Sequence, residues 1–287
     1  MYSGKTFDTF EPAMNQMLNF YGLPMFAHMD CAALRCFGFS ADPSLKKWFR
    51  PRVSLPIAVA ALSEAIGISL SCRALSPAEI GKKLLGYCGV IGPLEKGIAA
   101  PDIRQYYFNG DGRFLTVQSL PDETFAVYDP IGIPDIILDL PELMQLLKEG
   151  AFYIAPVLNV RSTDISTGNT MSKPEILRRG LKFHEKIRAM EAADLSRVSA
   201  AYRPGRHNGV ALSYCVINLA LQLDKVFLLA NSCAVPPGQL KVSYFMQKQE
   251  LYRSAERENA FGIVDALRQL WEILNEYGAY LGVFETE

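Results

Sequence analysis

Long apolar runs and paired metal-ligand motifs are missing from this sequence of 287 residues. The most apolar stretch, Gly209 to Leu223, contains Ser213, Asn218 and Gln222, and it is shorter than the 18 or more apolar residues that indicate a membrane span. We therefore interpret it as a buried helix. The amino-terminal residues lack the basic region and apolar core of a signal peptide, so we expect a cytoplasmic protein without membrane partners.

The sequence also lacks an excess of charge of one sign, because its 29 Lys and Arg residues nearly balance its 30 Asp and Glu residues, for a net charge of -1. This balance argues against nucleic acid as a partner, since phosphate binding needs an extended basic field. The six cysteines include no Cys-x-x-Cys and no paired histidine spacing, which argues against a zinc site or a disulfide framework. We expect no metal and no organic cofactor.

The composition that remains, 49% hydrophobic and 21% charged, is that of a globular protein, and the length predicts about two domains. Residues 1–160 are expected to form the first domain, in which helical and strand-like segments alternate between Pro and Gly residues. The expected strands are consecutive, which predicts an α+β domain with an antiparallel sheet. The helices are expected at Leu55 to Ile66, after Ser76, and at Pro141 to Glu149, and the strands at 68–72, 113–120, 125–128 and 152–160.

Residues 161–171 are polar without an apolar period and are interpreted as a linker. Residues 172–287 are then expected to form a helical domain, because apolar residues recur at helical spacing on one face of each segment. The predicted helices are 172–196, the apolar segment 209–223, and about 256–281.

Cys31 is the first candidate for chemistry. If Asp30 caps a helix that begins at Cys31, the thiol lies at the positive end of the helix dipole, where the thiolate is favoured. The alternative is that Cys31 is a core residue of a short apolar helix, as buried cysteines often are.

Three further stretches occur in a fixed order: Gly89 to Gly97 with its Gly-Pro-Leu, Tyr106 to Phe114 with Asp-Gly-Arg-Phe, and Val127 to Pro134 with Asp-Pro-Ile-Gly-Ile-Pro. Together with Cys31, this order resembles the amino-terminal domain of the butirosin-biosynthesis acyltransferase family and the related bacteriocin-processing cysteine peptidases. The resemblance covers roughly residues 27–160 and implies a papain-like fold.

The resemblance assigns Cys31 to the nucleophile and Asp129 to the carboxylate that orients the base. The general-base histidine of the family falls on Arg113. A guanidinium stays protonated at any working pH, so Arg113 cannot act as the base. We predict instead a buried or half-buried ion pair between Arg113 and Asp129, and an electrostatic role for Arg113 toward the Cys31 thiolate or an anionic substrate.

Other residues could supply the general base that Arg113 cannot provide, or further contacts with a substrate. His28 lies three residues before Cys31 and could replace the base if the chain folds back, or it is merely structural. Arg206 and His207 belong to a Gly- and Pro-containing stretch that we interpret as a loop, either anion-binding or simply solvated. We include Gly92 with Arg206 and His207 as candidate substrate contacts.

By resemblance, the expected function is cysteine-dependent acyl or aminoacyl transfer, or thioester or amide processing, in bacterial specialised-metabolite biosynthesis. Cys31 would accept an acyl group from an acyl- or peptidyl-carrier protein and pass it to a small-molecule acceptor. Two alternatives stay open: a non-catalytic papain-fold binding protein that has lost its histidine, and a cysteine peptidase.

Overall fold

The computed structural model describes residues 9–29, 37–39, 49–51, 53–84, 87–94, 113–130, 136–147, 151–158, 167–182 and 206–282. Contacts within the chain divide it into two compact units. The first combines Met1–Ala27 with Leu55–Thr170, and the second combines His28–Ser54 with Met171–Glu287. Residues 28–54 thus group with the second unit, whereas the sequence-based boundaries placed them in the first domain.

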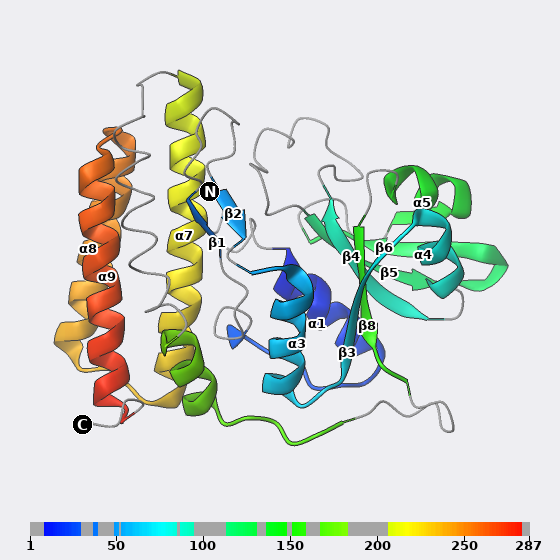
Figure 1. Ribbon diagram of the computed structural model, residues 1–287, viewed down its shortest axis with the longest axis horizontal. Helices are drawn as coiled ribbons and strands as arrows, with labels where there is room; N and C mark the ends of the chain where they lie inside the picture. The colour runs from blue at the N-terminus through cyan, green and yellow to red at the C-terminus, as the bar shows by residue number, and fades with distance from the viewer. Residues whose placement is uncertain are drawn as a thin grey trace. The chain divides into compact units, whose positions relative to one another are not determined.

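The first unit contains a six-stranded sheet in which every neighbouring pair of strands is antiparallel (Figure 1). The strand order is β3-β8-β4-β5-β6-β7, and this confirms the expected α+β class with an antiparallel sheet. The strands are β3 (Leu70–Leu75), β4 (Cys88–Leu94), β5 (Arg113–Ser119), β6 (Thr124–Tyr128), β7 (Ile136–Asp139) and β8 (Ala151–Pro156).

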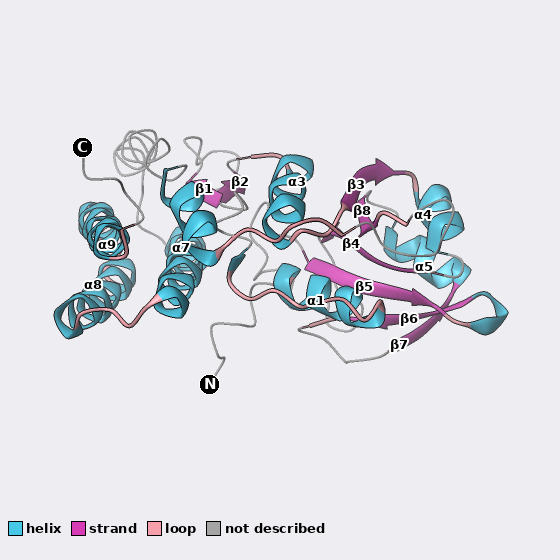
Figure 2. Ribbon diagram, turned by 90° about the horizontal axis from the view of Figure 1, so that it is seen from below, coloured by secondary structure: helices cyan, strands magenta, loops and turns pink. Residues whose placement is uncertain are grey.

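Helices cover both faces of this sheet, because its strands carry apolar residues on both sides. On β5, Leu115 and Val117 join the core under α4 and α5, while Phe114 packs edge-on against Phe10 of α1 at 5.0 Å between ring centres. Figure 2 shows α1 and the pair α4 and α5 on opposite sides of β5. The helices are α1 (Phe10–Phe20), α3 (Leu55–Ile66), α4 (Pro77–Leu84) and α5 (Leu140–Leu146), and η4 (Pro121–Glu123) is a short 3-10 turn.

Local capping sets where α4 and α5 begin. The Glu79 carboxylate accepts from the Ser76 backbone N–H at 2.8 Å, as the sequence pattern after Ser76 predicts. Asp139 and Glu142 form the same reciprocal arrangement at α5, with the Glu142 N–H donating to Asp139 Oδ1 at 2.8 Å. Each of these two capping boxes accepts hydrogen bonds from backbone N–H groups that have no partner within the first helical turn.

Buried threonines fasten α1 to β5. The Thr116 hydroxyl donates to the Ala13 carbonyl at 2.7 Å, and Thr9 Oγ1 accepts from the Phe114 backbone N–H at 2.8 Å. Both threonine side chains are buried, so these bonds satisfy polar groups that would otherwise lose water without a replacement. The sequence did not predict α1 or this attachment.

The second unit is mainly helical in the described residues. A strand pair, β1 (Phe37–Phe39) and β2 (Phe49–Pro51), is antiparallel, and β1 contacts α7. A helix spans 173–182, and the three long helices that follow contact one another pairwise. These are α7 (Arg206–Cys233), α8 (Gly238–Glu256) and α9 (Ala260–Tyr280).

The long helices correct two expectations. The apolar segment 209–223 is part of a longer helix, α7, which continues to Cys233, and α8 separates it from the last helix. The sequence pattern concealed α8 because three of its large apolar side chains, Val242, Phe245 and Met246, are solvent-exposed, which blurs its apolar period. Among the described residues, no helix is long and apolar enough to cross a membrane.

Aromatic rings form the core between the long helices. The Phe227 ring stacks on Tyr244 of α8 at 4.1 Å between ring centres, and it lies 6.0 Å from the ring of Tyr277 of α9. The Tyr244 hydroxyl donates to Asp224 Oδ1 at 2.9 Å, and Lys248 forms an ion pair with the same carboxylate. Burial and the neighbouring Asp224 charge raise the pKa of Tyr244 well above its usual value, so this hydroxyl remains a donor.

Candidate functional site

Arg113 and Asp129 form a buried ion pair in the first unit. The Arg113 guanidinium donates to Asp129 Oδ2 at 2.6 Å, and both side chains are 1% exposed. The predicted ion pair is therefore confirmed. The catalytic roles that the resemblance assigns to the two residues remain predictions.

The register of the sheet explains why these two side chains meet. Thr116 pairs with Tyr128 and Val117 with Val127, so the continued register sets Asp129 beside Leu115. Arg113 lies two residues before Leu115 on the same face and reaches Asp129 as a diagonal neighbour. This is the face that carries Leu115 and Val117 into the core under α4 and α5.

The pair differs chemically from an acid-base relay. The arginine holds its proton permanently, so it can orient or neutralise a charge but cannot accept a proton from a thiol. The Asp129 carboxylate accepts a charge-assisted hydrogen bond from the Arg113 guanidinium. In this geometry the two groups stabilise each other.

Gly92 lies on β4 beside this pair and is buried. It precedes Pro93 through a cis peptide bond and has a φ of 155°. A Cβ at Gly92 would lie 2.6 Å from the Phe114 ring and 2.7 Å from the Arg113 carbonyl oxygen. The close approach of β4 to β5 accounts for the glycine, and its candidate role as a substrate contact stays a prediction.

The cysteines with described side chains are poorly suited to nucleophilic attack. Burial raises the pKa of Cys72 and of Cys88 to about 12, and burial also raises the pKa of Cys233. A thiol with such a pKa is almost wholly protonated at neutral pH, and only the thiolate is a strong nucleophile. Cys31, the predicted nucleophile, lies outside the described residues.

The candidate histidines and Arg206 are placed only in part. His28 is half-buried, has a φ of 61°, and belongs to the second unit. Arg206 and His207 correct an expectation, because they form the first turn of α7 instead of a loop. Gly209 does not delay the helix, because apolar packing along α7 offsets the cost of about 1 kcal/mol that a helical glycine carries. The side chains of Arg206 and His207 lie outside the part that the structure describes.

Other polar contacts of the first unit escaped the sequence analysis. The Tyr21 hydroxyl donates to the Cys88 carbonyl at 2.8 Å and accepts from the Cys88 N–H at 3.0 Å. Such a bond links residues 67 positions apart, and no local pattern signals it. In the described part of the chain, no group of three or more His, Cys, Asp or Glu side chains is arranged to hold a metal ion.

Comparison with known proteins leaves the family open. No protein-family model matches the sequence, and no curated protein matches it.

Proposed function

We propose that the protein binds a thioester-linked acyl or peptidyl group without turning it over, as a papain-like protein whose histidine relay is replaced by an ion pair. The observation that carries the proposal is the buried Arg113–Asp129 pair, 2.6 Å apart, at the two positions where the resemblance expects a base and its orienting carboxylate. A relay that cannot accept a proton activates neither a thiol nor an acceptor amine.

The antiparallel sheet with helices on both faces is compatible with a papain-like first unit. Within this proposal, the Arg113–Asp129 ion pair stabilises the sheet at the position where the resemblance expects a relay. The protein then binds its ligand without catalysing a reaction. Cysteine-dependent transfer through Cys31 is the alternative. It requires a base other than Arg113, and a covalent thioester on Cys31 is its signature.

The test uses acetyl-pantetheine and aminoacyl-pantetheine as probes. Binding is measured by calorimetry, and covalent modification by intact mass, for the wild type, Cys31→Ala and the matched control Cys233→Ala. We expect all three proteins to bind a probe with equal affinity and none to gain the acyl mass. An acyl mass on the wild type and on Cys233→Ala, but not on Cys31→Ala, would establish transfer instead. Binding of neither probe would also overturn the proposal.

A further inference from the structure

Helix α3 closes on a glycine just beyond its last residue. Gly67 has a φ of 67°, in the left-handed region, and the Ile68 N–H donates to the Ser63 carbonyl at 3.2 Å across the last turn. This backbone arrangement is a common way to end a helix, and glycine adopts it without strain. The Ser63 hydroxyl also donates to the Ile68 carbonyl at 2.6 Å and accepts from the Leu70 N–H at 3.0 Å. The end of α3 is therefore fixed to the start of β3.

A segment much further along the chain, residues 167–170, fastens to this helix end, and we call it the strap. The Gly168 N–H donates to the Gly67 carbonyl at 2.7 Å, and the Thr170 hydroxyl donates to the Ile66 carbonyl at 3.2 Å. The last carbonyls of a helix have no partner within the helix. The strap therefore supplies donors that α3 lacks.

The strap passes so close to α3 that Gly67 has no room for a side chain. A Cβ at Gly67 would lie 2.7 Å from the Gly168 carbonyl oxygen and 2.8 Å from the Thr170 nitrogen, which are both backbone atoms. Thr167 adds an isolated antiparallel bridge to Ile68. Backbone atoms cannot turn aside as the end of a flexible side chain can, so the closed strap requires glycine at this position.

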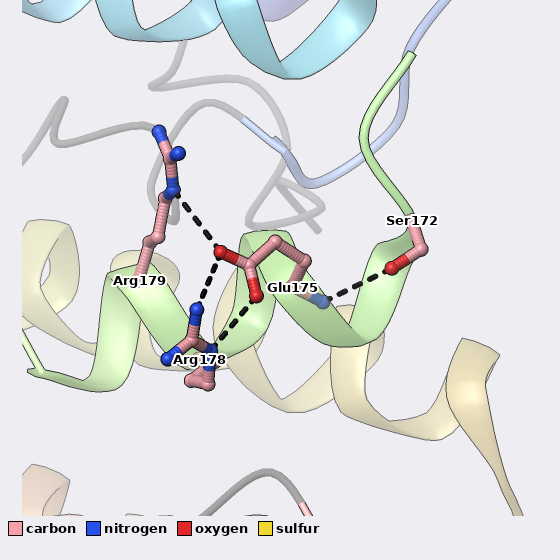
Figure 3. Close-up of polar contacts among 4 residues, drawn as sticks. All are labelled: Ser172, Glu175, Arg178 and Arg179. Carbon is pink, nitrogen blue, oxygen red and sulfur yellow. Dashed lines mark hydrogen bonds and ion pairs between the residues drawn. The ribbon is translucent and has the colours of Figure 1, made fainter. Parts of the chain in front are cut away.

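The closed strap shortens the connection from the first unit to the second. Its last residue, Thr170, is also the last residue of the first unit. Ser172 caps the helix at 173–182, because its hydroxyl accepts from the Glu175 N–H at 3.4 Å (Figure 3). Met171 is therefore the only residue between the strap and this cap.

Little burial keeps the strap in place. Its four residues are all solvent-exposed, whereas Ile66 and Ile68, at the end of α3, are only 8% and 3% exposed. Segments with few buried apolar contacts and exposed backbone hydrogen bonds open at a lower free energy than the core. The strap thus has a specific closed position that it can leave while the core of the first unit stays folded.

We propose that residues 167–170 are a releasable strap that sets the length of this connection between the two units. When the strap is closed, it caps α3 and leaves Met171 as the connector. When it opens, the connector becomes residues 167–171, which span up to roughly 17 Å at about 3.5 Å per residue. Helix α3 begins at Leu55, where the chain re-enters the first unit, so both ends of this helix adjoin a connection between the units.

Amide hydrogen exchange of the full chain, read residue by residue, tests the proposal. We expect the Gly168 amide to be protected, but at least about tenfold less than the amides of β4, a strand that is paired on both sides. Its protection should stay constant in urea below the unfolding transition, because local opening exposes little surface. Two wild-type results would overturn the proposal. Protection of Gly168 equal to that of β4 would mean that the strap opens only with the whole unit, and a lack of protection would mean that it does not close.

Gly67→Ala should lower the protection of the Gly168 amide by about tenfold or more, because the added methyl group overlaps the strap backbone. Gly22→Ala is the matched control, since Gly22 has a φ of 66° and a Cβ there meets no atom within 4 Å. It introduces similar backbone strain without the overlap and should change the protection of Gly168 by less than about twofold. Gly67→Ala should also speed thermolysin cleavage at the Thr170–Met171 bond, because proteases need an extended segment. Lowered protection with unchanged cleavage would overturn the lengthened connection.

Thr170→Val keeps the test decisive if Gly67→Ala does not fold by circular dichroism. This variant removes the hydroxyl that bonds to the Ile66 carbonyl, so the protection of the Gly168 amide should fall roughly fivefold. Thr170→Ser keeps the hydroxyl and should restore the protection. Unchanged protection of Gly168 in every variant that folds would overturn the strap.

Discussion

At the residue scale, the Arg113–Asp129 pair shows how the residue type beside a carboxylate decides the chemistry available there. A histidine beside a carboxylate can exchange protons near neutral pH, and an arginine cannot. The arginine does supply a permanent charge that can compensate the buried carboxylate. The Arg113 charge thus makes burial of the Asp129 carboxylate tolerable.

We expect Asp129→Ala to lower the free energy of unfolding by about 3–5 kcal/mol, because the Arg113 charge would stay buried without that carboxylate. Urea denaturation followed by circular dichroism measures the change. The exposed pair of Arg268 and Asp265 is the control, and Asp265→Ala should cost less than about 1 kcal/mol. Similar midpoints for Asp129→Ala and the wild type would contradict the account of the ion pair.

The thiols should differ in reactivity according to their pKa. With a pKa of about 12, Cys72 and Cys88 have roughly one thiolate per ten thousand molecules at about pH 8. We expect iodoacetamide to leave both unlabelled at that pH, with labelling of Cys72 increasing as the pH rises. We further expect Cys31 to be labelled before them, as read by peptide mass spectrometry. If Cys72 or Cys88 were labelled faster than Cys31, that thiol would not be desolvated as the structure indicates.

At the element scale, close contact between strands and helices decides which side chains are tolerated. Strand β4 approaches β5 so closely at Gly92 that a Cβ has no room. In the second unit, Tyr244 links α8 to α7 through Asp224 while its ring stacks on Phe227. Each contact joins two different helices or strands, so a substitution at either residue affects how those two elements pack together.

Gly92→Ala should destabilise the protein by about 1–3 kcal/mol, because the added methyl group would overlap the Phe114 ring and the Arg113 carbonyl oxygen. Gly238→Ala is the matched control, since a Cβ at Gly238 has no atom within 4 Å. Thermal melts of both variants measure the difference. Equal melting temperatures would mean that β4 and β5 separate here at little cost.

At the scale of the whole molecule, the two units do not follow the chain order. Residues 28–54 group with the carboxy-terminal helices although they precede most of the first unit in sequence. Strand β1, within that segment, contacts α7. Separation of the chain at a single point therefore cannot yield both units complete.

We expect a fragment of residues 171–287 to melt at a lower temperature than the same helices in the full chain, because it lacks the segment that contacts α7. Circular dichroism of the fragment and the full chain measures this. Addition of a peptide of residues 28–54 is the control and should raise the melting temperature. A fragment that melts cooperatively at the full-chain temperature would contradict the grouping of that segment with the helices.

Local patterns in the sequence determined much of the first unit. The helix at Leu55–Ile66 was predicted with its observed bounds, and the capping pattern at Ser76 correctly marked the start of α4. Strand β5 was predicted at 113–120 and ends one residue earlier, at Ser119. Strand β6 was predicted at 125–128 and begins one residue earlier, at Thr124. These features follow from interactions between residues a few positions apart, namely side-chain alternation, capping and turns, and such interactions are visible in a single sequence.

Only the tertiary structure decided the features that depend on distant partners. The insertion of β8 between β3 and β4, the attachment of α1 through Thr9 and Thr116, and the inclusion of residues 28–54 in the second unit all join remote segments. The ion pair of Arg113 with Asp129 lies between these cases. Its residue types and adjacent strands suggested it from sequence, but the diagonal register of β5 and β6 sets its 2.6 Å contact and the packed sheet makes it buried. Burial results from the sum of all packing contacts, and therefore no local pattern of residues fixes it.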